Sequence, residues 1–573
     1  MTYDHRKYRP FPQIERSNRR WPDRRIERAP IWCAVDLRDG NQALVKPMSV
    51  AQKTWMFQLL RDIGLKQIEV GFPSASQTEF DFVRSLIERD LVPGDITLQV
   101  LTPARADLIE RTFDSLRGAP RAIVHLYNST STVQRERVFE LDRAGIRNLA
   151  VHGAERVKAF AARAPDTEWT FQYSPESFTG TELDYAAEVV NAVIGVWRPE
   201  TGQKVIINLP ATVEMSTPNV YADMIEWMCE HIAHREHVKV SLHTHNDRGC
   251  GVAAAELGLL AGADRVEGTL LGNGERTGNM DLVTCAMNLY SQGVDPEIDL
   301  SDMRRIIETV ERCTEIETHP RHAYAGELVY TAFSGSHQDA IRKSLAKQRE
   351  DEAWRVAYLP IDPRDLGRNY EQVVRINSQS GKGGVLHVLE RDFGITLPRW
   401  LQIDFSKIVQ RESERQGGEL AAVVIRELFE REYVGQQSAR LSDYRLSRDG
   451  DRVRFRADIG GALLEGEGQG AVEALLDALT RAYQVKAMVE CFDEFALESG
   501  TDASAMACVK LRAGDKVGVG VSFAKDTTSA TLQAVLNALP AQLVGASTNG
   551  APLAVGRELD QVSTKTGTAS SRP

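Results

Sequence analysis

Several features that would assign this chain to other classes of protein are missing from its sequence. No apolar run approaches the ~18 residues that a membrane helix needs, and the first 30 residues contain no apolar core of a secretory signal. The seven cysteines are scattered and no two have CxxC spacing, so we expect reduced thiols. A formal net charge of -11 provides no basic field for nucleic acid. We therefore expect a cytoplasmic protein that binds neither membranes nor nucleic acid.

The length of the chain indicates several domains. At 573 residues it exceeds what one hydrophobic core supports, and its 42% hydrophobic and 26% charged residues are typical of globular proteins. We expect the basic N-terminal arm to pack on its own fold or on a neighbouring subunit. Changes in composition and in the pattern of apolar residues predict an arm (1–30), a barrel (31–326), helical linker subdomains (327–435), an α+β domain (436–545) and a disordered tail (546–573).

One pattern repeats between residue 31 and about residue 290. A near-continuous apolar run, as expected for a strand buried on both faces, is followed by an amphipathic helical stretch. Eight such units predict an α/β fold, the closed (β/α)₈ barrel. A doubly wound open sheet is the alternative, but it usually begins with a glycine-rich phosphate turn, which is absent here. The predicted strands are 31–36, 67–71, 96–101, 122–126, 169–173, 205–209, 238–242 and 265–270.

Polar side chains follow these strands, at the end of a barrel where enzymes place their active sites. His243 and His245 are two apart on the seventh strand, so both side chains face the same way. Asp39 follows the first strand, which neighbours the eighth in a closed barrel, and Asn279 follows the eighth. These four residues predict a divalent metal site with mixed nitrogen and oxygen ligands and two open positions.

The open positions would suit chelation by the carboxylate and keto oxygens of a 2-oxo acid. Mg²⁺ is our first choice of metal, and Mn²⁺, Zn²⁺ and Co²⁺ also suit the ligands. Arg38 would add a fixed positive charge for the alkoxide that forms when the keto carbon is attacked. A structural ion pair under the barrel mouth is the competing interpretation of this arginine.

The C-terminal part contains an internal repeat. The helical segment 473–479 resembles the segment 533–539, and two strand-like runs precede each of them, at 453–459 and 462–466 and at 505–511 and 517–523. This predicts two similar β-rich units, each closed by a helix. Before this domain we expect helices at 301–314 and 339–350, an irregular stretch at 354–370 and a flexible turn at 381–384.

Three motifs resemble the signatures of the 2-isopropylmalate synthases: Asp-Leu-Arg-Asp-Gly-Asn-Gln (36–42), His-Thr-His-Asn-Asp (243–247) and Gly-Asn-Gly-Glu-Arg-Thr-Gly-Asn (272–279). The resemblance covers nearly the whole chain and is closest to the long forms, whose C-terminal domain binds leucine as a feedback inhibitor. It implies a homodimer that condenses acetyl-CoA with 2-oxoisovalerate in leucine biosynthesis. K⁺ is a candidate activator.

The resemblance also implies roles for individual barrel residues. Asp39, His243, His245 and Asn279 match metal ligands, and Arg38 matches the residue that steadies the polarised carbonyl. His125 and Thr212 match residues that bind the carboxylate of the oxo acid. The wall around the isopropyl group is matched by Leu101, Ser174 and Pro210, and Glu176 and Glu275 match acidic residues of the site.

Beyond the barrel, His337 and Tyr370 match catalytic residues that the neighbouring subunit supplies in a domain-swapped dimer. Either His337 or Glu176 could remove the methyl proton of acetyl-CoA. A loop or cap histidine is the plainer interpretation of His337. The leucine pocket would be lined by the segments that contain Gly518, Gly520, Ser529 and Ala530, although a plain strand–turn–helix dimerisation unit would have the same pattern.

Other functions are less consistent with these residues. Homocitrate and citramalate synthases are the nearest alternatives, but Leu101, Pro210 and the lack of an extra cation favour a branched apolar side chain over a dicarboxylate. Barrel amidohydrolases usually carry His-x-His on the first strand, and here it is on the seventh. A non-enzymatic sensor scaffold would have a degraded metal set, yet all four predicted ligands are present.

Overall fold

The computed structural model describes residues 11–12, 14–368, 382–416, 420–435, 441, 443–459, 462–484, 486–497 and 503–539. The chain forms two compact units. One comprises Met1–Thr331 and Leu359–Tyr370, and the other comprises Ala332–Tyr358 and Glu371–Pro573. The tail predicted at 546–573 and the side chain of Tyr370 lie outside the described residues.

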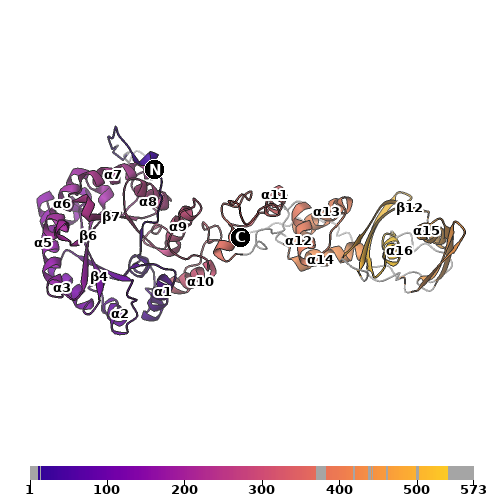
Figure 1. Cartoon of the computed structure of the whole chain (residues 1–573), viewed down its shortest axis with the longest axis horizontal. Coiled ribbons are helices and arrows are strands. Elements are labelled where there is room, and N and C mark those ends of the chain that lie inside the picture. The colour runs from indigo at the N-terminus through magenta and orange to yellow at the C-terminus, as the bar shows by residue number, and fades with distance from the viewer. Residues whose placement is uncertain are drawn as a thin grey trace, which may run out of the picture. The chain divides into compact units, whose positions relative to one another are not determined.

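Eight strands form a closed parallel barrel in the first unit, in the order β1 to β8. The barrel closes where Ile31 of β1 pairs with Arg265 of β8, and helices surround it (Figure 1). The predicted (β/α)₈ fold is confirmed, and the open sheet is excluded. The strands are β1 (Ile31–Ala34), β2 (Gln67–Gly71), β3 (Thr97–Pro103), β4 (Arg121–Ser129), β5 (Glu168–Glu176), β6 (Lys204–Ala211), β7 (Val238–Thr244) and β8 (Arg265–Gly268).

The barrel helices follow the strands as the periodicity predicts. The first begins with a capping box, in which Ser49 and Gln52 exchange hydrogen bonds that satisfy free backbone N–H groups. Among the described residues, no helix is both long enough and apolar enough to cross a membrane. The helices are α1 (Val50–Asp62), α2 (Gln77–Glu88), α3 (Ala106–Ser115), α4 (Thr132–Gln134), α5 (Arg143–Ala161), α6 (Leu183–Trp197), α7 (Pro218–His231), α8 (Gly251–Leu260), α9 (Leu282–Tyr290) and α10 (Met303–Thr314).

The described part of the N-terminal arm packs on α7. Arg19 Nε donates to Asp223 Oδ1 at 2.8 Å, and Trp21 Nε1 donates to the same oxygen at 2.9 Å. Arg16 forms ion pairs with Glu226 and Glu230 on the next turns of the helix. The basic residues of the arm therefore neutralise an acidic face of their own fold.

The second unit contains helices in the predicted helical region, but the helix predicted at 339–350 begins and ends earlier, at Gly335 and Leu345. The turn predicted at 381–384 is wrong, because a helix begins at Lys382 and includes both following glycines. Val385, Val388 and Leu389 are buried in a core with α13 and α14, and this packing outweighs the low helix propensity of glycine. The helices are α11 (Gly335–Leu345), α12 (Lys382–Phe393), α13 (Arg399–Gln416) and α14 (Ala422–Phe429).

The C-terminal domain consists of two three-stranded antiparallel sheets, each closed by a helix, as the internal repeat predicts. The first strand of each unit was not predicted. Both of these strands lie at a sheet edge, and neither has a fully buried residue, so neither carries the buried face that marks a core strand. The elements are β9 (Tyr444–Asp449), β10 (Arg452–Ile459), β11 (Ala462–Gly468) and α15 (Ala471–Tyr483), then β12 (Ala487–Ala496), β13 (Ala505–Ala513), β14 (Lys516–Ala524) and α16 (Thr527–Asn537).

Two glycines at related positions let each helix approach its sheet. A Cβ at Gly466 of β11 would overlap the backbone of Ala474 and Ala478 in α15. A Cβ at Gly520 of β14 would overlap the backbone of Ala534 and Ala538 in the same way. The two units of the internal repeat therefore share the same strand–helix contact, in which a strand glycine faces two alanines of the helix segment.

Gly520→Ala is expected to lower the free energy of unfolding of this domain by about 1–3 kcal/mol, the usual cost of overpacking a tight contact. Chemical denaturation followed by circular dichroism measures the change. Gly195→Ala on α6 is the control, because an added Cβ there meets no atom within 4 Å, and helix propensity favours alanine. Equal stability of Gly520→Ala and the unmodified chain would contradict the close approach.

Candidate active site

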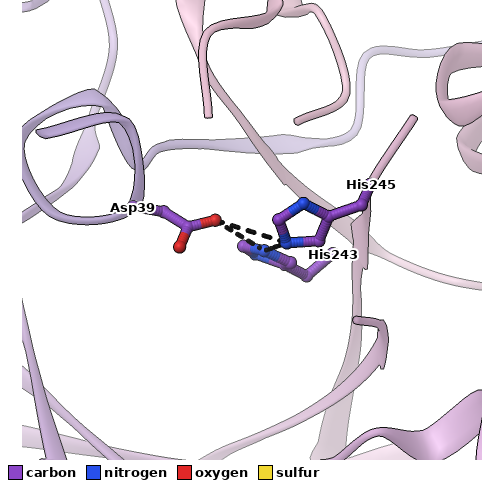
Figure 2. A group of neighbouring side chains, drawn as sticks. All are labelled: Asp39, His243 and His245. Carbon is purple, nitrogen blue, oxygen red and sulfur yellow. Dashed lines mark hydrogen bonds and ion pairs between the residues drawn. The ribbon is translucent and has the colours of Figure 1, made fainter. Parts of the chain in front are cut away.

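Three candidate metal ligands converge at the C-terminal mouth of the barrel. Asp39 lies on a π-helical turn, η3 (Asp36–Gly40), that follows β1, while His243 lies near the end of β7 and His245 follows the strand. Figure 2 shows the carboxylate of Asp39 facing both imidazole rings. Asp39 Oδ2 lies 3.2 Å from Nε2 of His243 and 3.5 Å from Nε2 of His245. All three residues are buried, and their ligand atoms lie within 4.8 Å of one another.

Asn279, the fourth predicted ligand, is held beside this cluster. Its backbone forms an isolated bridge with His245, and its Nδ2 donates to the carbonyl of Asn273 at 3.0 Å. Its Oδ1 is buried and accepts no hydrogen bond from the described part of the chain. A buried amide oxygen without a donor is costly, and a cation next to the three other ligands would satisfy it. The residues present therefore suit a divalent metal ion.

The two imidazoles differ in their affinity for protons. Burial lowers the pKa of His243, but its hydrogen bonds to Asp39 and Glu267 outweigh burial and raise the pKa to about 9. Burial and the neighbouring His243 lower the pKa of His245 to about 4. The cluster thus holds positive charge next to the Asp39 carboxylate, at the point where a cation would replace the proton.

Glu267 of β8 orients His243 from below. This buried carboxylate accepts a hydrogen bond from His243 Nδ1 at 2.9 Å, which leaves Nε2 directed at Asp39. It also accepts from Arg265 Nη1 at 2.6 Å and from Gln172 Nε2 at 2.7 Å. Burial raises the pKa of Glu267, but Arg265 and His243 outweigh it and keep the pKa well below its usual range.

Glu69 of β2 orients Arg38 and His125 by accepting hydrogen bonds from both side chains. It accepts from Arg38 Nε at 2.5 Å and from His125 Nδ1 at 2.7 Å. Arg38 Nη1 also donates to Asp39 Oδ1 at 2.7 Å. The structural ion pair considered for Arg38 is therefore present, and the same guanidinium also lines the pocket above the cluster.

A pocket of about 300 Å³ covers the cluster. It brings together every barrel residue that the sequence predicts for the site except Asn279. The predicted residues that line it are Arg38, Asp39, Leu101, His125, Ser174, Glu176, Pro210, Thr212, His243, His245 and Glu275. The prediction missed Gln42, Phe72, Tyr127, Asn208 and Arg276, although each lies at or just after the C-terminal end of a barrel strand.

The polar groups on one side of the pocket form a chain of hydrogen bonds. His125 Nε2 lies 2.7 Å from Ser174 Oγ, which accepts from Asn208 Nδ2 at 2.9 Å. Thr212 Oγ1 accepts from the backbone N–H of Ser177 at 2.9 Å. The side chain of Ser174 is thus fixed on both sides, whereas its wall neighbours Leu101 and Pro210 contribute apolar surface.

The catalytic residues predicted beyond the barrel are not part of this pocket. His337 lies in the first turn of α11, in the second unit, where its exposed ring stacks on Tyr358 with ring centroids 4.0 Å apart. Tyr370 lies outside the described residues. The roles of both residues remain predictions.

The four residues predicted for leucine binding lie in β14 and α16. Ala530 is fully buried in the domain core, and Ser529 Oγ lies 3.0 Å from the hydroxyl of Tyr444. Gly518 and Gly520 pair with Leu511 and Val509 of β13. A pocket of about 500 Å³ lies beside them, and none of the four lines it. Its walls include Val472, Leu476, Val489, Phe492, Thr527, Thr528 and Thr531.

Comparison with known protein families assigns all three parts of the chain. Residues 29–310 match the HMGL-like family, and residues 327–390 match the family described as alpha-isopropylmalate synthase, post-catalytic domain-like. Residues 419–543 match the LeuA allosteric (dimerisation) domain. The α+β domain is therefore a regulatory and dimerisation domain.

Curated relatives match almost the entire chain. A 2-isopropylmalate synthase of Alcanivorax borkumensis is 60% identical over 545 residues, which cover 94% of this chain and 98% of the relative. One from Rhodospirillum rubrum is 55% identical over 93% of this chain and 97% of its own length. One from Pseudomonas savastanoi pv. phaseolicola is 53% identical over 93% and 96%.

Glu267→Gln is expected to weaken the affinity for Mn²⁺ by roughly 10- to 100-fold, because the neutral amide no longer fixes the His243 tautomer. Isothermal titration calorimetry on the metal-free protein measures the affinity. Glu182→Gln removes a carboxylate paired with Arg135 outside the pocket and serves as the matched control. Thermal unfolding shows whether each variant is folded. Unchanged Mn²⁺ affinity in folded Glu267→Gln would contradict the orienting role.

Proposed function

The chain belongs to the 2-isopropylmalate synthase family, and from this premise we propose that it condenses acetyl-CoA with 2-oxoisovalerate and releases 2-isopropylmalate and CoA. The observation that carries this proposal is the buried Asp39–His243–His245 cluster beneath a pocket at the barrel mouth. The reaction is an acyl transfer of leucine biosynthesis, in which the acyl group becomes an alkyl group.

We propose that Asp39, His243, His245 and Asn279 hold Mg²⁺, with Mn²⁺, Zn²⁺ and Co²⁺ as the other ions that suit these ligands. Such an ion would supply Lewis acidity at the keto group of the oxo acid. Arg38 places a fixed positive charge beside the oxygen that becomes an alkoxide. Because Glu69 and Asp39 already hold the guanidinium, it needs little reorganisation during the reaction.

The pocket walls support a branched apolar substrate. Leu101 and Pro210 present apolar surface, and the hydroxyl of Ser174 is occupied by its neighbours. No further cation is expected there from the sequence, but Arg276 also lines the pocket. Asp247 pairs with this guanidinium at 2.6 Å, so its charge is already matched. We propose that His125 and Thr212 bind the carboxylate of the oxo acid.

Proton transfer requires a base near the methyl group of acetyl-CoA. Glu176 and Glu275 line the pocket, and Glu176 accepts a hydrogen bond from the Ser129 hydroxyl. Imidazole is the commonest general base near neutral pH. We therefore propose that His337 of a partner subunit removes the methyl proton, assisted by Tyr370, while Glu176 serves the later hydrolysis of the thioester.

The match of the C-terminal domain to the LeuA allosteric (dimerisation) domain supports a homodimer that leucine inhibits. We propose that leucine binds near Gly518, Gly520, Ser529 and Ala530. We also propose that the protein acts in the cytoplasm, where acetyl-CoA and the oxo acid are available, and that K⁺ activates it.

Release of CoA, measured with a thiol reagent, tests the proposed reaction. The protein is given acetyl-CoA, Mg²⁺ and, separately, 2-oxoisovalerate, 2-oxoglutarate or pyruvate, each with and without leucine. We expect release with 2-oxoisovalerate and suppression by leucine. Release only with 2-oxoglutarate, or only with pyruvate, would show that this acid is the substrate and that 2-oxoisovalerate is not. No release by folded, metal-loaded protein would contradict the condensation.

Leu101→Ala is expected to lower kcat/KM for 2-oxoisovalerate roughly tenfold, and to favour the oxo acid that is one carbon longer, because a pocket wall discriminates methylene groups by about this factor. Steady-state kinetics with both acids measure the ratio. An unchanged ratio would place the alkyl group of the substrate away from Leu101.

A further inference from the structure

The predicted catalytic histidine of the second unit is in contact with an aromatic ring. The imidazole of His337 and the phenol of Tyr358 have centroids 4.0 Å apart and planes inclined by 24°, which is a stacked arrangement. Both residues belong to the same compact unit. The exposed fraction of Tyr358 is 61%, so its ring contributes little to a hydrophobic core.

The backbone of Tyr358 is in a conformation that tyrosine rarely adopts. Its φ of 63° lies in the left-handed region, which is unfavourable for a bulky side chain and suits glycine. The chain passes from the second unit to the barrel unit at the next residue, Leu359, which is buried, as is Ile361. The turn itself therefore requires a left-handed residue and would form more readily with glycine.

Folding alone does not explain why a tyrosine occupies this strained and exposed position. Strain of this kind concentrates at functional sites, and here the ring lies on a histidine that is otherwise loosely held. Among the described residues, none forms a hydrogen bond with a ring nitrogen of His337. The stacked phenol is therefore the contact that limits rotation of the imidazole.

We propose that Tyr358 is a positioning residue, which holds the imidazole of His337 in the orientation needed for proton transfer. This inference rests on the proposed catalytic role of His337. The ring of Tyr358 does the positioning, and its hydroxyl is not required. The left-handed backbone places the ring on His337 instead of directing it elsewhere.

Two variants of the full-length protein at Tyr358 test the proposal in the CoA-release assay. Tyr358→Phe keeps the ring and is expected to retain kcat within about twofold. Tyr358→Gly removes both the ring and the strain, and is expected to lower kcat roughly tenfold with little change in KM for 2-oxoisovalerate, because misorientation of a reacting group acts on the chemical step. Its unfolding temperature should equal or exceed that of the unmodified chain, since glycine suits the turn.

Glu297→Gly is the matched control for strain relief. Glu297 is exposed, has a φ of 57° and belongs to the barrel unit, so its replacement should leave kcat unchanged. If the loss in Tyr358→Gly came from a general loosening of the chain, a lower unfolding temperature would accompany it, and if it came from loss of the hydroxyl, Tyr358→Phe would show the same loss of kcat. Either result would overturn the positioning role.

A double-mutant cycle separates this inference from the proposed function. In a His337→Ala background, Tyr358→Gly should cause no further loss of kcat, because its effect passes through the imidazole. If His337→Ala alone has normal kcat, the catalytic role of His337 fails, and the positioning role fails with it. If His337→Ala is impaired while Tyr358→Gly has normal kcat, the proposed function stands and the positioning inference is wrong.

Discussion

The active end of this barrel depends on two carboxylates buried inside it. Glu69 and Glu267 have almost no exposed surface, and each buried ion costs several kcal/mol unless charges and hydrogen bonds compensate it. Arg38 and Arg265 supply the opposite charges, and Gln99 donates to both carboxylates. Because these partners come from strands far apart in the sequence, the network is satisfied only when the barrel is closed in this register.

The same network fixes the groups that face the pocket. Glu267 sets the tautomer of His243, and Glu69 holds Arg38 and His125. Each of these side chains therefore arrives at the pocket in one orientation, fixed by a partner inside the barrel. Electrostatic stabilisation of a developing alkoxide depends on such preorganisation, since groups that need not move contribute most. The buried charges that are costly for folding are therefore the same groups that hold the pocket residues in position.

The sequence predicted the eight strands, the helical connections and most of the residues that line the pocket, because buried parallel strands and their polar ends have a strong pattern. It did not identify Glu69, Gln99, Gln172, Arg265 or Glu267 as a network, since polar residues within a strand do not reveal which strands they join. The turn predicted at 381–384 was wrong because the buried residues after Lys382 determine a helix. β9 and β12, which were missed, are edge strands without a fully buried residue.

The two units of the C-terminal domain show what a repeat in sequence can and cannot reveal. The segments 473–479 and 533–539 are similar because each places alanines against a strand glycine, Gly466 in the first unit and Gly520 in the second. This packing is sufficient to explain why no side chain is present at Gly520, whether or not leucine binds nearby. The threonines at the start of α16, Thr527 and Thr528, line a neighbouring pocket. The repeated glycine already joins its helix to its sheet, so a ligand that binds near Gly520 would contact the side chains around this glycine and not the glycine itself.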